Sequence, residues 1–282
     1  MPRSSCRFPG RPRLTPPAAL LVAVLALAAC RGSDDDLTGR AVATATEERS
    51  VALEGRTLVL DGFAGDVRVL ADPTLSEVRL RAERSARGAT DGSAAARLEG
   101  VTLREAGGAD LYQFVWRTEH EAGTRVDVEV RVPPGTAVTL RLGAGDLVAE
   151  GLEGALDAEL GAGTATATGL TASEVRLRTG SGALEVEARA LPAGAAYTLE
   201  TGAGEIVLAL PAAASVNVEA ETRAGQVRLG DLPFEGPRLT TSGGQARFRA
   251  RLGRGQARVE ARTGAGDVVF RETGTDADNL AP

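Results

Sequence analysis

Apolar and polar residues alternate in short runs along the second half of the chain, and a glycine turn separates each run from the next. The stretch Val175–Arg178 alternates aliphatic residues with arginines, and Ala246–Leu252 does the same over seven residues. Period-two alternation places one set of side chains on each face of a strand, whereas helical spacing fits neither run. The pattern predicts β-strands with one dry face and one charged face.

The glycine turns recur at a nearly constant spacing. Between their last glycines the steps are 18, 19, 22, 21, 19 and 22 residues. A period near twenty indicates supersecondary units that bury their apolar faces only by stacking on their neighbours. The seven turns are Gly143-Ala144-Gly145, Gly161-Ala162-Gly163, Gly180-Ser181-Gly182, Gly202-Ala203-Gly204, Ala224-Gly225, Gly243-Gly244 and Gly264-Ala265-Gly266.

These repeats predict an all-β protein whose residues 136–272 form a β-solenoid. Aromatic residues make up only 3% of the chain, so the interior is expected to be narrow and filled by small side chains. Seven windings stacked at a strand spacing of about 4.8 Å would make a rod about 34 Å long. A row of hairpins forming a meander or a sandwich is the competing arrangement.

Residues 50–135 are β-rich without the regular period, and they are expected to form an irregular N-terminal module. The stretch Gly65–Val69 looks like one repeat corner placed early, which suggests that the module pairs with the coil. One short helix is expected over Ser93–Leu103, with Asp91 or Ser93 capping its start and the helix covering an open edge. Residues 273–282 are expected to form a disordered tail.

The N-terminus has the features of an export signal spanning residues 1–29. Four arginines precede an apolar run of twelve residues, which is too short to span a bilayer, for which about 20 residues are needed. The junction Leu27-Ala28-Ala29-Cys30 resembles the lipobox of bacterial lipoproteins, which predicts a membrane anchor through lipidated Cys30. Ordinary signal cleavage after Ala28 is the alternative, and residues 30–49 are expected to form a flexible tether.

Charge and cysteine content narrow the possible partners. All 32 basic residues are arginine, and removal of the signal would leave 28 of them against 38 acidic residues, a net charge of about −10. This balance argues against nucleic acid as a partner. Cys6 would leave with the signal and Cys30 would carry the lipid, so no disulfide is expected.

No catalytic site, metal site or cofactor is expected from the sequence. The single histidine, His120, lies in the polar stretch Arg117–Glu121, where a solvent-exposed turn is the simpler interpretation. Asp66, Asp146 and Asp267 follow glycine corners, but their spacing does not match the nine-residue repeat of calcium-binding β-rolls. Their simpler role is that of turn residues.

A carbohydrate-active enzyme on a β-helix remains an alternative. Its candidate carboxylates point outward from the predicted strands, and the sequence does not place an acid against a base. They are Glu159, Glu185, Glu187 and Glu205.

The densest charge feature is a group of six arginines offset within the same stretch only by Glu260. Stacked guanidinium groups could bind anionic glycans or phosphates. The simpler interpretation is that alternate residues of exposed strands are charged and balance acidic rows in adjacent turns. The group, termed the arginine cluster, comprises Arg247, Arg249, Arg251, Arg254, Arg258 and Arg262.

With signal, lipobox and a recurring Thr-Gly-x-Gly-acid-aliphatic corner, the chain resembles a bacterial putative-adhesin family of β-strand-repeat surface proteins. The best matching stretches are Thr179–Leu184, Thr201–Ile206 and Thr263–Val268, and Val126–Thr139 looks like the start of that family's repeats. The resemblance covers roughly residues 50–272. It implies a single-stranded, right-handed β-helix-like fold and an envelope location.

The sequence therefore favours a lipid-anchored protein of the bacterial cell envelope, a non-catalytic scaffold with an adhesin-like binding surface for a glycan or an envelope protein. A structural or regulatory partner of an envelope membrane complex is the main alternative. The carbohydrate-active enzyme is the second.

Overall fold

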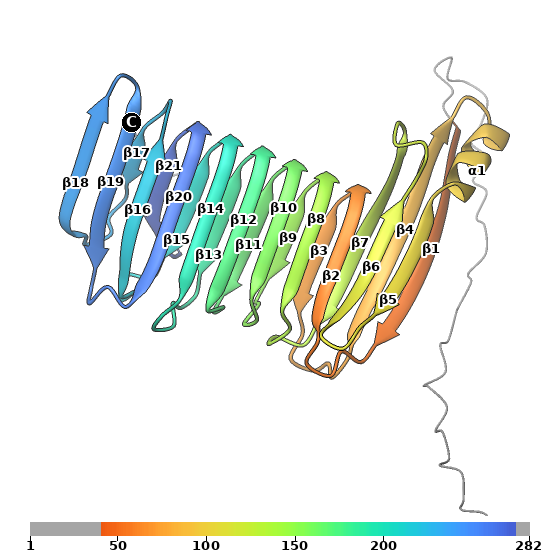
Figure 1. The fold of residues 1–282 in the computed structure, drawn as a ribbon, viewed down its shortest axis with the longest axis horizontal. Coiled ribbons are helices and arrows are strands. Elements are labelled where there is room, and N and C mark those ends of the chain that lie inside the picture. Colours follow the sequence, from red (N-terminus) through yellow and green to blue (C-terminus); the bar gives the residue numbers. More distant parts are fainter. Residues whose placement is uncertain (1–40, 275–282) are drawn as a thin grey trace, which may run out of the picture.

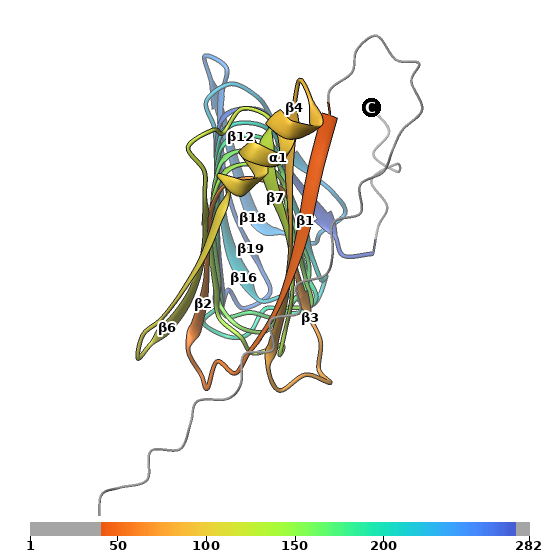
Figure 2. The ribbon, with the colours of Figure 1, turned by 90° about the vertical axis from the view of Figure 1, so that its right-hand side faces the viewer.

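A computed structural model describes residues 41–274 as two facing β-sheets, which Figure 1 shows side-on and Figure 2 end-on. The all-β class is confirmed, and both sheets contain parallel and antiparallel neighbours. The predicted signal, Cys30, residues 31–40 of the predicted tether and residues 275–282 of the predicted tail lie outside the described residues.

Sheet A contains ten strands. In spatial order they are β1 (Ala41–Val51), β4 (Val78–Gly88), β7 (Thr124–Val132), β3 (Val67–Ala71), β9 (Leu147–Glu150), β11 (Ala165–Leu170), β13 (Leu184–Ala188), β15 (Ile206–Leu210), β21 (Val268–Glu272) and β17 (Val227–Leu229).

Sheet B contains eleven strands. In spatial order they are β18 (Glu235–Ser242), β19 (Gln245–Leu252), β16 (Val216–Thr222), β20 (Ala257–Ala265), β14 (Ala196–Ala203), β12 (Glu174–Ser181), β10 (Leu156–Ala162), β8 (Val138–Ala144), β2 (Thr57–Ala64), β6 (Leu111–Arg117) and β5 (Thr102–Gly107).

From β8 to β15 the chain passes alternately through the two sheets, and it crosses at each glycine corner. Strands β8, β10, β12 and β14 pair in parallel in sheet B. Strands β9, β11, β13 and β15 do the same in sheet A. The two strands that flank a corner therefore lie in different sheets, and this region does not form hairpins.

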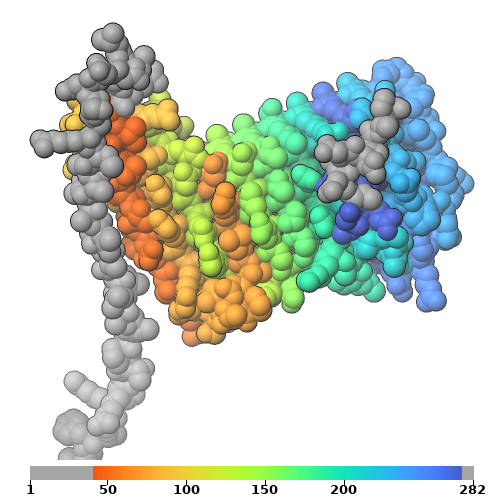
Figure 3. Space-filling view, turned by 180° about the vertical axis from the view of Figure 1, so that it is seen from behind, coloured from red at the N-terminus to blue at the C-terminus, as the bar shows by residue number. Residues whose placement is uncertain are grey.

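The spatial order departs from the chain order at both ends of the stack. Strand β20 lies between β14 and β16, and β21 lies between β15 and β17. At the other end β2 lies between β6 and β8, and β3 lies between β7 and β9. Seen from behind, this interleaving breaks the colour order, with orange β3 among green strands (Figure 3). The segments 50–135 and 136–272 thus share both sheets, as the early corner at Gly65 suggested.

The corner glycines let successive passes of the chain approach closely. Gly145 has φ +132°, and a Cβ there would overlap the carbonyl oxygen of Gly65 in the neighbouring pass. Gly163 stands in the same relation to Gly145, with φ +139°. Because an L side chain fits neither the backbone angle nor the space, only glycine is suited to these positions.

The threonine that precedes the corners at Gly180, Gly202 and Gly264 also has a structural role. The Thr201 hydroxyl donates to the Gly182 carbonyl at 3.0 Å, and the Thr263 hydroxyl donates to the Gly204 carbonyl at 2.9 Å. Both threonines are buried, so these bonds satisfy polar groups that water does not reach. The Thr-Gly-x-Gly pattern is therefore explained by contacts between neighbouring passes.

The turn at Gly243-Gly244 is not one of these corners, contrary to the sequence prediction. It joins β18 and β19 as an antiparallel pair, with Ser242 opposite Gln245. Both glycines have positive φ, +58° and +86°. Two adjacent positive φ values are typical of two-residue hairpin turns, whereas in the Gly-x-Gly corners only the second glycine has one.

The flexible tether predicted for residues 30–49 is wrong for residues 41–49. These belong to β1, which pairs antiparallel with β4 over its full length. The polar, threonine-rich composition suggested a linker, but an outermost strand with one wet face has the same composition. The alternation in Ala41–Thr46 is the signal that could have revealed the strand.

The one helix among the described residues, α1, spans Asp91–Glu99 and not Ser93–Leu103. Thr90 is the N-cap and exchanges hydrogen bonds with Ser93, while Gly100 follows the last turn. The helix buries Ala94 and Leu98 against β1 and β4, at the end of the stack that it was expected to cover.

The core between the sheets is mainly aliphatic in the middle of the stack and richer in aromatic rings near its ends. Leucine, valine and alanine fill most of the central passes, as the low aromatic content predicted, with Tyr197 of β14 as a buried exception. Phe114 and Trp116 are buried near the N-terminal end of the stack. Phe234, Phe248 and Phe270 pack at centroid distances of 5.5–5.9 Å near the other end, where the two sheets stop at different strands.

Candidate ligand-binding surface

The outer face of sheet B carries one row of alternating charges that crosses eight strands. Each member lies opposite the next in the strand register, so every charge has neighbours of opposite sign. We call it the charge row; from β19 to β2 it comprises Arg247, Glu221, Arg262, Glu200, Arg178, Glu159, Arg141 and Asp61.

Ion pairs join several neighbouring members of the charge row in the part of it that lies nearer β19. Arg247 contacts Glu221 at 3.0 Å, and Glu200 contacts both Arg178 at 3.0 Å and Arg262 at 3.4 Å. These side chains are partly exposed, so each pair contributes little stability alone. Together the charges nevertheless favour the observed order of strands, because in that order each charge lies beside charges of opposite sign on the adjacent strands.

The arginine cluster is distributed over two strands that do not touch. Arg247, Arg249 and Arg251 lie on β19, and Arg258 and Arg262 lie on β20, with Arg254 in the turn between the strands. Strand β16 lies between β19 and β20. The structure thus separates residues that the sequence placed in one group.

Within their own stretch only Glu260 offsets these arginines, but in the structure carboxylates of other strands do so as well, as the simpler interpretation expected. Three further carboxylates pair with the β19 arginines: Arg247 with Glu221 at 3.0 Å, Arg249 with Glu219 at 2.7 Å and Arg251 with Glu235 at 2.6 Å. Arg258 and Arg262 contact Glu260, and Arg262 also contacts Glu200. The partners come from β14, β16 and β18, which are distant in sequence, so a local count of charges could not find them.

The pair of Glu219 and Arg249 is the best defined of these contacts electrostatically. The hydrogen bond from Arg249 is the main cause that lowers the pKa of the Glu219 carboxyl, with the charges of Arg249, Arg262 and Arg258 adding to it. Glu219 therefore remains ionised in mildly acidic solution and neutralises Arg249 there.

A groove of about 600 Å³ lies at this end of the sheet, over β18, β19, β16 and β20. Four arginines and two glutamates line it together with Asn217 and parts of the strand backbones, so its charge is positive although the whole chain has a net charge of −6. The charged residues are Arg238, Arg249, Arg251, Arg258, Glu219 and Glu235.

Arg238 belongs to this groove and was missed by the sequence analysis. It lies on β18 directly opposite Arg249, and within residues 41–274 it has no carboxylate partner. The pairing of β18 shifts register between Glu235 and Arg238, so the strand lacks the alternation that identified its neighbour. The groove thus contains one guanidinium group that no carboxylate of the described residues neutralises.

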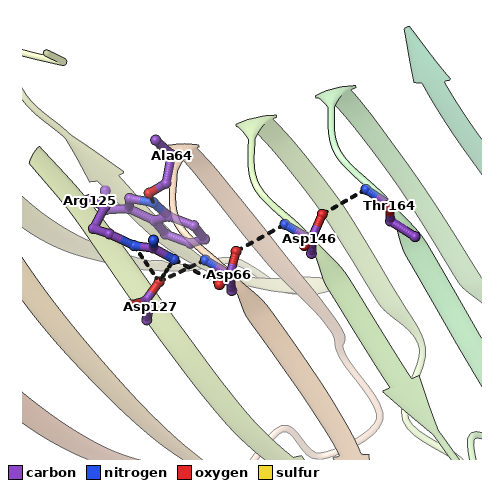
Figure 4. Close-up of polar contacts among 7 residues, drawn as sticks. Ala64, Asp66, Arg125, Asp127, Asp146 and Thr164 are labelled. Atoms are coloured by element: carbon purple, nitrogen blue, oxygen red, sulfur yellow. Dashed lines mark hydrogen bonds and ion pairs between the residues drawn. The ribbon is translucent and has the colours of Figure 1, made fainter. Parts of the chain in front are cut away.

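The aspartates at the glycine corners serve as backbone acceptors (Figure 4). The Asp127 carboxylate accepts from the Asp66 amide at 2.8 Å, Asp66 from the Asp146 amide at 3.1 Å, and Asp146 from the Thr164 amide at 2.8 Å. Asp267 binds the Gln226 amide in the same way. These carboxylates link successive corners of the stack through hydrogen bonds to backbone amides. Residues 41–274 contain no cluster of three or more His, Cys, Asp or Glu side chains able to hold a metal ion.

The candidate enzymatic residues do not converge. Glu159 lies on β10 of sheet B, whereas Glu185 and Glu187 lie on β13 of sheet A, and Glu205 lies at a corner between the sheets. Glu185 is paired with Arg271 at 2.6 Å. His120 is exposed in the loop between β6 and β7, where its carbonyl accepts a hydrogen bond from the Thr124 hydroxyl.

Comparison with known proteins shows that the fold of this chain resembles that of a solved structure. No family model matches the chain, and no curated protein matches its sequence. A solved structure described as a putative cell adhesion protein from Clostridium sporogenes aligns with a TM-score of 0.51 and 13% identity, over 82% of this chain and all of that one. A putative adhesin from Bacteroides fragilis aligns at 11% identity with a TM-score of 0.41, over 80% of this chain and 96% of that one.

Within residues 41–274, no helix has the length and apolar character needed to cross a bilayer.

Proposed function

We propose that this chain is a non-catalytic, adhesin-like protein of the bacterial cell envelope. Its two-sheet body would be a β-solenoid scaffold, and lipidated Cys30 would anchor it to a membrane. The likeness of fold to a structure described as a putative cell adhesion protein supports the adhesin-like role. The apolar run followed by Leu27-Ala28-Ala29-Cys30 supports the anchor.

The observation that carries the binding role is the positive groove over β18, β19, β16 and β20. Most arginines of sheet B face a carboxylate, but Arg238 has none within residues 41–274 and lies opposite Arg249. Two adjacent guanidinium groups attract an anion and offer it planar, bidentate donors. We therefore propose an anionic glycan, bearing carboxylate or sulfate groups, as the ligand.

The test is binding of the full chain to an array of neutral and anionic glycans. The chain carries Cys30→Ala so that lipid plays no part, and it is compared with the double variant Arg238→Ser, Arg249→Ser, which removes the two adjacent guanidinium groups. We expect binding to uronate-containing or sulfated glycans that weakens at least about tenfold in the variant, because each charge-assisted hydrogen bond contributes roughly 1.5–3 kcal/mol. Added salt should weaken the wild-type interaction as well.

Arg176→Ser is the matched control, because Arg176 lies on the outer face of the same sheet, on β12, away from the groove. It should bind as the wild type does. Equal loss in the control and the groove variant would mean general charge attraction and would contradict a specific site. Absence of glycan binding, with one stoichiometric protein partner recovered from envelope extracts, would favour the role of a structural or regulatory partner instead.

A further inference from the structure

The two sheets have four edges, and three of them are poorly suited to pairing with another strand. Strand β17 has only three residues. Strand β18 contains Pro237 next to a register shift, and both features obstruct an added strand. Strand β5 has six residues and runs into Gly107-Gly108.

The fourth edge, β1, is neither short nor interrupted, although α1 packs against β1 and β4 at this end of the stack. It runs for eleven residues, Ala41–Val51, without proline or glycine, and it pairs on one side only, with β4. Its first half consists of alanine, valine and threonine, and Val42 is 58% exposed. A long, regular edge of this kind is a template for a further strand.

The charged side chains of β1 are held by its own sheet and its neighbours. Arg49 contacts Glu47 and Glu105, each at 2.6 Å, and Arg84 contacts Glu47 at 2.8 Å. These ion pairs fix the second half of the strand in place. The backbone groups on its outer side are then presented by a rigid strand, which lowers the entropy cost of adding another.

We propose that β1 is a homodimer interface, at which the β1 strands of two copies pair antiparallel about a two-fold axis through Thr46. The pairing would join sheet A of one copy to sheet A of the other and remove the open edge. This inference does not depend on the proposed glycan ligand, because the groove lies at the opposite end of the stack.

Charge and the length of overlap together favour one register for a second copy. With Thr46 opposite its own copy, all eleven residues pair, Glu47 faces Ala45 and Glu48 faces Thr44, so no like charges lie opposite each other. Moving the axis by one residue to Glu47 would place two carboxylates face to face. The register with the greatest overlap is thus also free of charge repulsion, which favours a second copy as the occupant.

Sedimentation equilibrium of the full chain carrying Cys30→Ala tests the proposal. We expect the chain with an unchanged β1 strand to sediment with twice the monomer mass of 28.9 kDa. Thr46→Arg should raise the dissociation constant at least about tenfold, because it places two guanidinium groups opposite each other at the axis. Within the monomer this substitution is tolerable, since position 46 lies beside Glu83 on β4.

Two further variants separate this register from a general effect of charge. Thr44→Arg adds the same charge to the same strand but places it opposite Glu48 of the other copy, so it should tighten the dimer. A mixture of Thr46→Arg with Thr46→Glu should restore the dimer mass that each variant lacks alone. A monomeric wild-type chain, or a dimer that Thr46→Arg does not weaken, would overturn the proposal.

Discussion

Glycine at the corners determines how closely neighbouring passes of the chain can pack. Gly145 lies against Gly65, and Gly163 lies against Gly145, so each corner depends on the absence of a side chain in the next. Threonine hydroxyls and aspartate carboxylates at these corners then form hydrogen bonds with backbone carbonyl and amide groups of the neighbouring pass. Stability at the corners is therefore sensitive to single atoms.

Gly145→Ala should lower the free energy of unfolding by about 2 kcal/mol or more, because the new Cβ meets the Gly65 carbonyl at a backbone angle that alanine rarely adopts. Urea titration monitored by circular dichroism measures the change. Gly135→Ala is the control, since a Cβ there meets no atom within 4 Å and its φ is not in the positive range, and it should change stability by less than about 0.5 kcal/mol. Equal effects of the two substitutions would contradict the role given to the corner.

At this scale much could be predicted from the sequence. Alternation assigned Val175 and Leu177 to the core and Arg176 and Arg178 to the surface, and the structure places them so. The ionic partners could not be predicted, because Arg249 meets Glu219 only after β19 and β16 have become neighbours. Arg238 was missed for a different reason, because β18 shifts register between Glu235 and Arg238 and lacks the alternation seen in β19.

At the scale of elements, the position of β20 determines the electrostatics of sheet B. Arg262 on β20 lies between Glu221 on β16 and Glu200 on β14. If β16, the next strand of sheet B along the chain, lay beside β14, these two glutamates would be neighbours. The observed order replaces one repulsive contact by two attractive ones.

Arg262→Glu should therefore destabilise the protein by about 1 kcal/mol at low salt, because it places three carboxylates side by side. Raising the salt concentration should remove most of this loss in a chemical denaturation series. Arg189→Glu, at an exposed position with no ion pair inside the described region, serves as the control and should have little effect. A loss that does not depend on salt would show that packing, not charge, is responsible.

Elements outside the regular repeats were harder to predict. Gly243-Gly244 fits the repeat spacing, but two adjacent glycines at positive φ form a hairpin. Residues 41–49 have the composition of a linker, yet they complete sheet A as β1. In both cases composition and period suggested one structure, and the partner strand determined another.

At the scale of the whole molecule, the strands in the middle of the stack lie in the order of the chain, whereas strands from different parts of the chain are interleaved at both ends. Near the C-terminus β16 and β17 precede β20 and β21 in the chain, yet β20 and β21 lie inside them in the sheets; near the N-terminus the inner strands β2 and β3 come first and β6 and β7 lie outside them. No periodicity within the sequence indicates such an order, because each pass has the same pattern of apolar and polar residues. The predicted boundary near residue 135 likewise has no counterpart in the sheets.

Disulfide trapping across sheet B tests this order most directly, in a chain whose Cys6 and Cys30 are replaced by alanine. Glu200→Cys with Arg262→Cys, and Arg262→Cys with Glu221→Cys, place thiols on adjacent strands at the same level, about 4.8 Å apart in the backbone, which suits a disulfide. We predict that both pairs cross-link under mild oxidation, while Glu200→Cys with Glu221→Cys does not, since β20 separates them. Efficient cross-linking of that last pair, without the first two, would show that the strands stack in chain order and would contradict the architecture described here.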